Sequence, residues 1–261
     1  MTATAFTRSG VAILILWFSA IAAFGAEPTY EGKSLTRWLK LYDRANEGSS
    51  EEAEAAAALR AIGSNAVPFL VEWIGSNTSE VQLVSADAFK VLKETGASAV
   101  PELGLMLIGT NQLVATVAAS ALGHIGAPAL PVLMTGLTNR QFRVGVDASQ
   151  ALVELGTNAK PAIPILLADL RHPNHFYRER AANVLGQLHI EAETVVPALI
   201  KLLDDDSKAA RFMAITGLAN FGAEARSAVP ALTRFLKDEE SGVRRTATNA
   251  LKQIQSAGPP K

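Results

Sequence analysis

A pair of residues, Ala and Leu four positions apart, recurs seven times along the chain. The Leu residues follow one another at spacings of 33, 30, 30, 33, 33 and 33. The pairs are Ala55 and Leu59, Ala88 and Leu92, Ala118 and Leu122, Ala148 and Leu152, Ala181 and Leu185, Ala214 and Leu218, and Ala247 and Leu251. Residues four apart share one face of a helix. Small side chains let helices approach closely, and Leu fills the space between them. The pattern therefore predicts a row of packed helices.

A second amphipathic helix is predicted after each of the first six pairs. Each begins near a Pro, with Leu two residues later and Leu or Ile six residues later. These Pro residues are Pro68, Pro101, Pro131, Pro164, Pro197 and Pro230. Pro is tolerated in a first turn because its missing N–H would have no helical partner there. A two-helix unit that repeats every 30 to 33 residues predicts an all-α fold, an α-solenoid.

The residue four positions after the repeat Leu is Gly in most copies. It is Gly63, Gly96, Gly126, Gly156 or Gly222, and His189 and Gln255 are the exceptions. Gly readily adopts the left-handed conformation that ends a helix. We therefore expect these residues to end the first helix of each unit.

Two stretches identify the repeat. The pattern R-x-x-A-A-x-x-L-G-x-L at 178–188, with V-P-A-L after it and again at 229–232, resembles HEAT repeats of the phycobilisome-lyase type. The resemblance covers about residues 51–255. It implies a right-handed superhelix of about six two-helix repeats with a half repeat at the C-terminus, its second helices lining the concave surface. The stretch Y-E-G-K-S-L-T-R-W-L at 30–39 looks like the start of exported bacterial HEAT-repeat proteins.

Residues 1–26 have the pattern of a signal peptide. An uncharged apolar run at 11–24 follows Arg8, and Ala20-x-Ala22 and Ala23-x-Gly25 offer cleavage positions. The run is shorter than the roughly 20 apolar residues of a membrane span. We expect cleavage and a periplasmic or secreted protein; the alternative is an uncleaved membrane anchor.

Residues 27–50 form a lead-in with a cap helix, and residues 256–261 a disordered tail. Leu35, Trp38, Leu39 and Tyr42 make one apolar stripe after Ser34, a good N-cap residue. We interpret this helix as a cap that docks on the first repeat, because a stacked array must cover its end. The alternative is an exposed aromatic platform for a ligand.

The composition of the chain argues against several classes of function. The net charge is −1, so no global basic field exists to hold nucleic acid. The chain has no Cys, which excludes disulfides, thiolate chemistry and Cys-ligated metals.

The His residues do not predict an active site. HEAT-like deoxyhypusine hydroxylases bind di-iron through His-Glu dipeptides, and none occurs here. His172 and His175 are spaced as half of a metal site, but we favour an ordinary turn between repeats because further ligands are missing. We interpret His124 and His189 as helix-end residues. We therefore expect no catalytic residue, no metal and no cofactor.

Arg178, Arg211 and Arg244 stand one repeat apart. We interpret them as a ladder between repeats, each bonding to helix-end carbonyls or to acids among Asp204–Asp206, Glu239 and Glu240. The alternative is a binding stripe.

A partner surface is predicted on the second helices, at positions one, four and five after each Pro. The candidate residues are Phe69, Trp73, Leu105, Met106, Val132, Thr135, Ile165, Lys201 and Arg234. An exposed apolar strip usually marks an interaction site. The function predicted is a non-enzymatic scaffold for a protein or peptide partner. Three alternatives stay open: positions one and five are buried between helices; the protein is a HEAT-like enzyme or accessory of the bilin-lyase or metal-dependent hydroxylase class; or it is a structural spacer.

Overall fold

The computed structural model describes residues 25–76 and 78–256. The expected signal peptide, up to residue 24, and the expected tail from residue 257 lie outside the described residues. The chain divides into two compact units, residues 1–154 (unit 1) and 155–261 (unit 2). None of the helices in the described ranges is long and apolar enough to cross a membrane.

Unit 1 opens with a two-stranded antiparallel sheet, in which β1 (Thr29–Tyr30) pairs with β2 (Lys33–Ser34). The cap helix α3 (Leu35–Arg44) follows. The Ala–Leu pairs lie on the first helices α4 (Ser50–Ile62), α6 (Ser79–Leu92), α8 (Gln112–Ile125) and α10 (Phe142–Glu154). The second helices are α5 (Val67–Gly75), α7 (Val100–Leu107) and α9 (Leu130–Leu137). The 3-10 helices η1 (Gly63–Ala66), η2 (Lys93–Ala99) and η3 (Ala127–Ala129) connect first to second helices.

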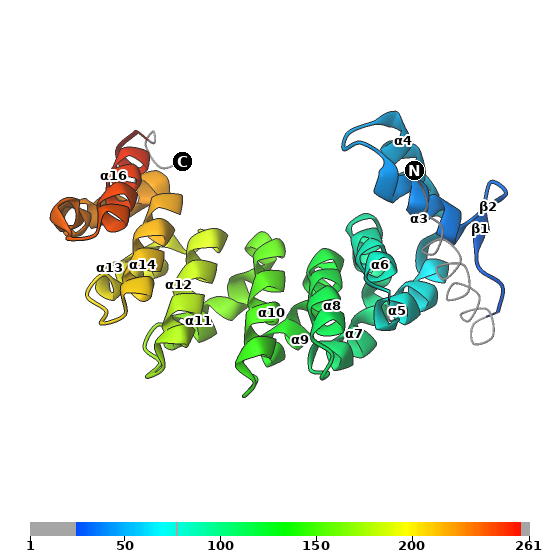
Figure 1. The fold of residues 1–261 in the computed structure, drawn as a ribbon, viewed down its shortest axis with the longest axis horizontal. Coiled ribbons are helices and arrows are strands. Elements are labelled where there is room, and N and C mark those ends of the chain that lie inside the picture. Colours follow the sequence, from blue (N-terminus) through cyan, green and yellow to red (C-terminus); the bar gives the residue numbers. More distant parts are fainter. Residues whose placement is uncertain (1–24, 77, 257–261) are drawn as a thin grey trace, which may run out of the picture. The chain divides into compact units, whose positions relative to one another are not determined.

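Unit 2 continues the same arrangement. Its first helices are α12 (His175–Leu188), α14 (Lys208–Asn220) and α16 (Ser241–Ser256), so that α16 extends one residue into the expected tail. Its second helices are α11 (Ile163–Asp169), α13 (Ala192–Leu202) and α15 (Val229–Thr233), with 3-10 helices η4 (Gly156–Ala162), η5 (Gly222–Ala228) and η6 (Arg234–Lys237). Within each unit consecutive first helices pack against one another (Figure 1). The prediction of an all-α solenoid of two-helix repeats is confirmed.

The core consists of the repeated positions. All seven Ala–Leu pairs are buried, and their most exposed member, Leu251, is 8% exposed. The Leu two residues after each Pro is buried in the same way, from Leu70 to Leu232. Each repeat therefore contributes the same layer of side chains, as the period of the sequence requires.

The ends of the first helices follow the prediction only in part. Gly63 and Gly126 end α4 and α8 with φ of 59° and 89°, but with ψ of −135° and −142°, outside the left-handed helical region. His189 does adopt that region, with φ 38° and ψ 43°. The role expected of Gly96 is wrong, because α6 ends at Leu92 and the positive φ falls on Lys93. Gly96 is needed for its size instead, since a Cβ there would lie 2.5 Å from the ring of Phe89.

The cap interpretation of the lead-in is confirmed. Helix α3 packs on α4 and α6, and Ser34 caps it by accepting a hydrogen bond from the Arg37 N–H at 3.3 Å. Trp38 is fully buried, and its indole N–H donates to the Tyr30 carbonyl at 3.0 Å. A ring with no exposed surface cannot serve as a ligand platform, so that alternative is wrong for Trp38.

Gly186 on α12 and Gly217 on α14 show how closely two first helices approach. A Cβ added at Gly186 would lie 2.4 Å from the Gly217 Cα. We expect Gly186→Ala to lower the free energy of unfolding by about 1–3 kcal/mol, because the helices must separate to admit the methyl group. Gly242→Ala is the matched control, since a Cβ there meets nothing within 4 Å. Chemical denaturation followed by circular dichroism measures both variants, and equal stability would contradict the close packing.

Candidate functional site

The predicted partner surface divides according to position along each second helix. The fourth residue after the Pro is exposed at Leu105, Thr135, Lys201 and Arg234. Leu105 is 68% exposed, more than any other large hydrophobic residue in the described part of the chain. We call these residues the second-helix ridge, which has one part in unit 1, Leu105 and Thr135, and one in unit 2, Lys201 and Arg234.

Positions one and five are less accessible. Phe69 and Trp73 are only 4% and 3% exposed, so their prediction as surface residues is wrong. Met106, Val132 and Ile165 are half-buried. At about 100° per residue, position four lies opposite the buried Leu stripe, whereas position five lies only about 80° from it. The alternative of burial at these positions is thus confirmed for Phe69 and Trp73.

Unit 2 carries a groove beside this ridge, with a cavity volume of about 390 Å³. It lies between α11 and α13, and we call it the α11–α13 groove. Its apolar lining is Leu167, Leu170, Pro197, Ala198 and Leu202, and its polar lining is Arg171, Thr194, Lys201, Asp204 and Asp205. The ridge residue Lys201 therefore also belongs to the wall of a concave site.

The acidic and the basic side chains of the groove differ in their pairing. Asp204 pairs with Arg234, whose Nη2 lies 2.6 Å from Oδ1. Asp205 pairs with Arg178. Arg171 and Lys201 are exposed, and neither has an ion-pair partner among residues 25–76 and 78–256. The groove therefore presents uncompensated positive charge.

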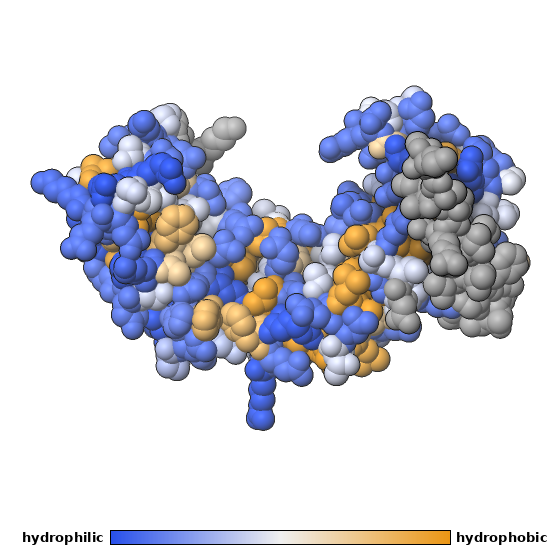
Figure 2. Space-filling model, in the orientation of Figure 1, coloured by the Kyte–Doolittle hydropathy of each residue, from blue (hydrophilic) through white to orange (hydrophobic). Residues whose placement is uncertain are grey.

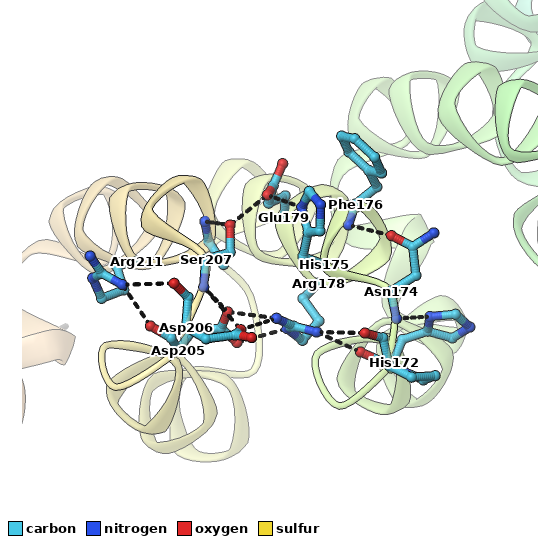
Figure 3. Close-up of polar contacts among 12 residues, drawn as sticks. His172, Asn174, His175, Phe176, Arg178, Glu179, Asp205, Asp206, Ser207 and Arg211 are labelled. Carbon is cyan, nitrogen blue, oxygen red and sulfur yellow. Dashed lines mark hydrogen bonds and ion pairs between the residues drawn. The ribbon is translucent and has the colours of Figure 1, made fainter.

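The Arg178–Asp205 pair joins two successive repeats (Figure 3). Nε donates to Asp205 Oδ2 at 2.7 Å and Nη2 to Oδ1 at 2.8 Å, while Nη1 donates to the His172 carbonyl at 2.9 Å. The two side chains are 11% and 9% exposed. Bidentate pairing of this kind fixes geometry as well as charge.

The contact between Arg178 and Asp205 shifts the pKa of both groups. Burial raises the pKa of Asp205, but hydrogen bonds from Arg178 and from the Ser207 backbone N–H outweigh it, so that the pKa is lowered overall. The pKa of Arg178 is raised, chiefly by its hydrogen bonds to Asp205. Both groups are therefore held in their charged forms.

Arg211 and Arg244 repeat the contacts of Arg178 with backbone carbonyls. Arg211 Nη1 donates to the carbonyls of Asp205 at 2.7 Å and Asp206 at 3.2 Å (Figure 3). Arg244 Nη1 donates to those of Asp238 at 2.7 Å and Glu239 at 2.8 Å. Like Arg178, each binds the carbonyls six and five residues before it. The prediction that these Arg residues satisfy nearby acids and helix-end carbonyls is confirmed.

His172 lies in a turn between repeats, and His175 is the first residue of α12. Asn174, between them, caps α12 by accepting from the Phe176 N–H at 3.0 Å. His172 Nδ1 accepts from the Asn174 N–H at 3.1 Å, and His175 Nδ1 lies 2.7 Å from Glu179 Oε1 (Figure 3). The turn interpretation is confirmed for His172, whereas His175 belongs to the first turn of α12.

His124 and His189 lie at helix ends, as predicted. His124, near the end of α8, bridges to the Ala86 carbonyl on α6 at 3.0 Å and to Glu154 Oε2 on α10 at 3.1 Å. His189 caps α12. Within the described ranges no three His, Cys, Asp or Glu residues are grouped so as to hold a metal ion.

A second groove, in unit 1, was not predicted. It has a cavity volume of about 310 Å³ and is lined by residues of α6, α8 and α10, including Leu83, Leu113 and Val117. Leu83 and Leu113 are 54% and 46% exposed, and Figure 2 shows hydrophobic surface where α6 and α8 lie. Each stands nine residues before a repeat Leu, as does Phe176, which is 52% exposed. That shared position was the available signal.

We expect Asp205→Asn to lower the free energy of unfolding by about 2 kcal/mol at pH 7, because Arg178 loses a charged acceptor. The pKa of Asp205 is lowered in the folded state. Its stabilising contribution is therefore present above the unfolded carboxyl pKa of about 3.9, and is lost as the pH falls through the folded value. Urea unfolding at a series of pH values should show the difference from wild type shrinking below about pH 4.

Asp206→Asn is the control for this pair. Asp206 also contacts Arg178, at 2.5 Å, but its side chain is 91% exposed. It should cost less stability than Asp205→Asn because exposed ion pairs contribute little. A difference at Asp205 that persists unchanged at pH 3 would contradict the electrostatic interpretation.

Comparison with known proteins identifies the repeats of unit 2. The HEAT repeat model matches residues 196–260, and the PBS lyase HEAT-like repeat model matches residues 177–205. Residues 177–260 are therefore similar to HEAT repeats, in agreement with the resemblance seen in the sequence. No curated protein matches the chain.

Solved structures share the fold. An engineered protein is 22% identical, with a TM-score of 0.50, over 86% of this chain and 98% of its own. The complex of CpcE and CpcF of phycocyanin lyase from Nostoc sp. PCC7120 is 21% identical, with a TM-score of 0.51, over 59% and 98%. A designed armadillo repeat protein in complex with the peptide (KR)4 is 18% identical, with a TM-score of 0.51, over 85% and 100%. At these identities the likeness establishes the solenoid fold.

Proposed function

We propose that this HEAT-repeat solenoid is a non-enzymatic scaffold that binds a protein or peptide partner through its second-helix ridge. The observation that carries the proposal is the 68% exposure of Leu105 at a position where Thr135, Lys201 and Arg234 are also exposed. A solvated Leu of this size contributes to binding when a partner covers it. Within each unit, neighbouring second helices each present one such residue, Leu105 and Thr135 in unit 1 and Lys201 and Arg234 in unit 2, which suits a partner that spans more than one repeat.

Two solenoids of the same fold support this class of partner. One is a complex of two proteins, CpcE and CpcF, and the other is an armadillo repeat protein in complex with a peptide. Stacked repeats generally form extended binding surfaces. Some charged residues, such as Arg178 and Asp205, are committed to contacts within the solenoid.

Leu105→Asp should weaken partner binding at least about tenfold, because a charge replaces the most exposed apolar side chain of the ridge. Stability should change little, since the side chain is already exposed. Crosslinked capture from the native cell envelope identifies the partner, and titration with the purified partner measures the affinity.

Leu83→Asp is the matched control for this experiment. Leu83 is 54% exposed on the first helix α6, outside the second-helix ridge. The substitution should leave the affinity unchanged. Loss of binding in Leu83→Asp but not in Leu105→Asp would overturn the assignment of the ridge and favour the unit 1 groove.

We also propose that the protein acts outside the cytoplasm. The support is the signal-peptide pattern of residues 1–26. Intact-mass and N-terminal analysis of the protein from fractionated cells should find a mature chain that begins at Ala23 or Ala26, in the periplasmic or secreted fraction. A chain that begins at Met1 in the membrane fraction would instead indicate the uncleaved anchor.

The match of residues 177–205 to the PBS lyase HEAT-like repeat favours one second candidate. This is an accessory or catalytic role in attaching a bilin to a protein. Absorbance titration of the purified chain with a free bilin distinguishes the two functions. A saturable spectral change would support the bilin role, whereas an unchanged spectrum would support the scaffold.

A further inference from the structure

The floor of the α11–α13 groove is apolar. It is formed by Leu167 on α11, by Leu170 directly after that helix, and by Pro197, Ala198 and Leu202 on α13. The cavity volume of about 390 Å³ is within the range of sites that take small ligands or a few side chains. A ligand that fills the groove therefore gains by burying apolar side chains against this floor.

The acids of the groove cannot readily serve a cationic ligand. Asp205 is held by two hydrogen bonds from Arg178, and Asp204 lies 2.6 Å from Arg234. A basic ligand would have to displace one of these Arg side chains. The contact of Asp205 with Arg178 is also the better shielded from solvent, which makes displacement costly.

The bases of the groove are available. Arg171 and Lys201 are exposed on its lining, and in the described part of the chain neither forms an ion pair. Unit 2 as a whole contains 14 Lys and Arg against 11 Asp and Glu, whereas unit 1 contains 10 against 14. Charge complementarity thus favours an anionic ligand at this groove, and the apolar floor favours one that also carries hydrophobic side chains.

We propose that the α11–α13 groove binds an acidic peptide segment of the partner, with aliphatic side chains on the Leu167–Leu202 floor and carboxylates paired with Arg171 and Lys201. The inference deepens the proposed function and rests on it. It names the chemistry of the segment: acidic residues next to Leu-like residues. The guanidinium of Arg171 suits a carboxylate because its planar donors can pair with both oxygens.

The test uses the purified full chain and three fluorescent peptides in anisotropy titrations. The first peptide is Gly-Asp-Leu-Asp-Leu-Asp-Gly, the second has Lys in place of Asp, and the third has Ser in place of Leu. We expect only the first to bind wild type, with an affinity that falls as salt increases. The combined substitution of Arg171→Glu and Lys201→Glu should weaken it at least about tenfold and should transfer binding to the Lys peptide.

Lys252→Glu is the control, because Lys252 is an exposed base on α16 that does not line the groove. It should leave the affinity for the acidic peptide unchanged. An equal loss of affinity in this control and in the groove variant would overturn the proposal. Equal binding of the Ser peptide and the acidic Leu peptide would also overturn it, because the groove would then bind anions without using its apolar floor. A dimer of the chain that the groove variant dissolves would assign the groove to a second copy instead.

The outcome is separable from that of the proposed function. If the purified partner binds wild type and fails to bind Leu105→Asp, while the acidic peptide binds neither, the scaffold stands and the groove assignment fails. If the acidic peptide binds and no partner depends on Leu105, the groove stands and the ridge fails.

Discussion

The structure depends on close packing between first helices, which small side chains permit. Ala118 and Leu122 on α8 are both fully buried, and the same pair recurs on every first helix. Between α12 and α14 the approach is closer still, because Gly186 and Gly217 bring the two backbones almost into contact. A larger residue at these positions would force adjacent repeats apart. The other contacts between those repeats depend on the same short distance between their first helices.

Tight packing also decides which side chains remain exposed to solvent. When the Leu stripe of a second helix is buried, residues beside the stripe are covered as well. Trp73 lies beside it and is inaccessible, whereas Leu105 lies opposite it and projects into solvent. The residues on the opposite side of the helix do not pack into the core. Its residues can therefore differ between repeats, from Leu105 and Thr135 to Lys201 and Arg234, without disturbing the core.

Two groups of charged residues differ in their contacts: one is paired within the solenoid and the other, among the described residues, is unpaired. Arg178, Arg211 and Arg244 bind the carbonyls that precede their helices, and Arg178 also binds Asp205 of the following repeat, so these charges stabilise the turns. Arg171 and Lys201 make no such contact within the described residues and line an apolar groove. Paired and unpaired charges thus lie within a few residues of each other, and they differ in whether a carbonyl or carboxylate is within reach.

The sequence by itself determined the architecture, because a period of 30 to 33 residues with Ala, Leu and Pro at constant positions has one economical solution, a row of stacked helix pairs. It also determined the cap role of α3 and the use of the repeated Arg residues. Tertiary structure decided accessibility, which depends on neighbours from other repeats: Phe69 and Trp73 are covered, Leu83 and Leu113 are not, and Gly96 accommodates the ring of Phe89 rather than ending a helix. It likewise decided which bases are free, since the pairing of Asp205 with Arg178 bridges 27 residues of sequence and leaves Arg171 and Lys201 uncompensated.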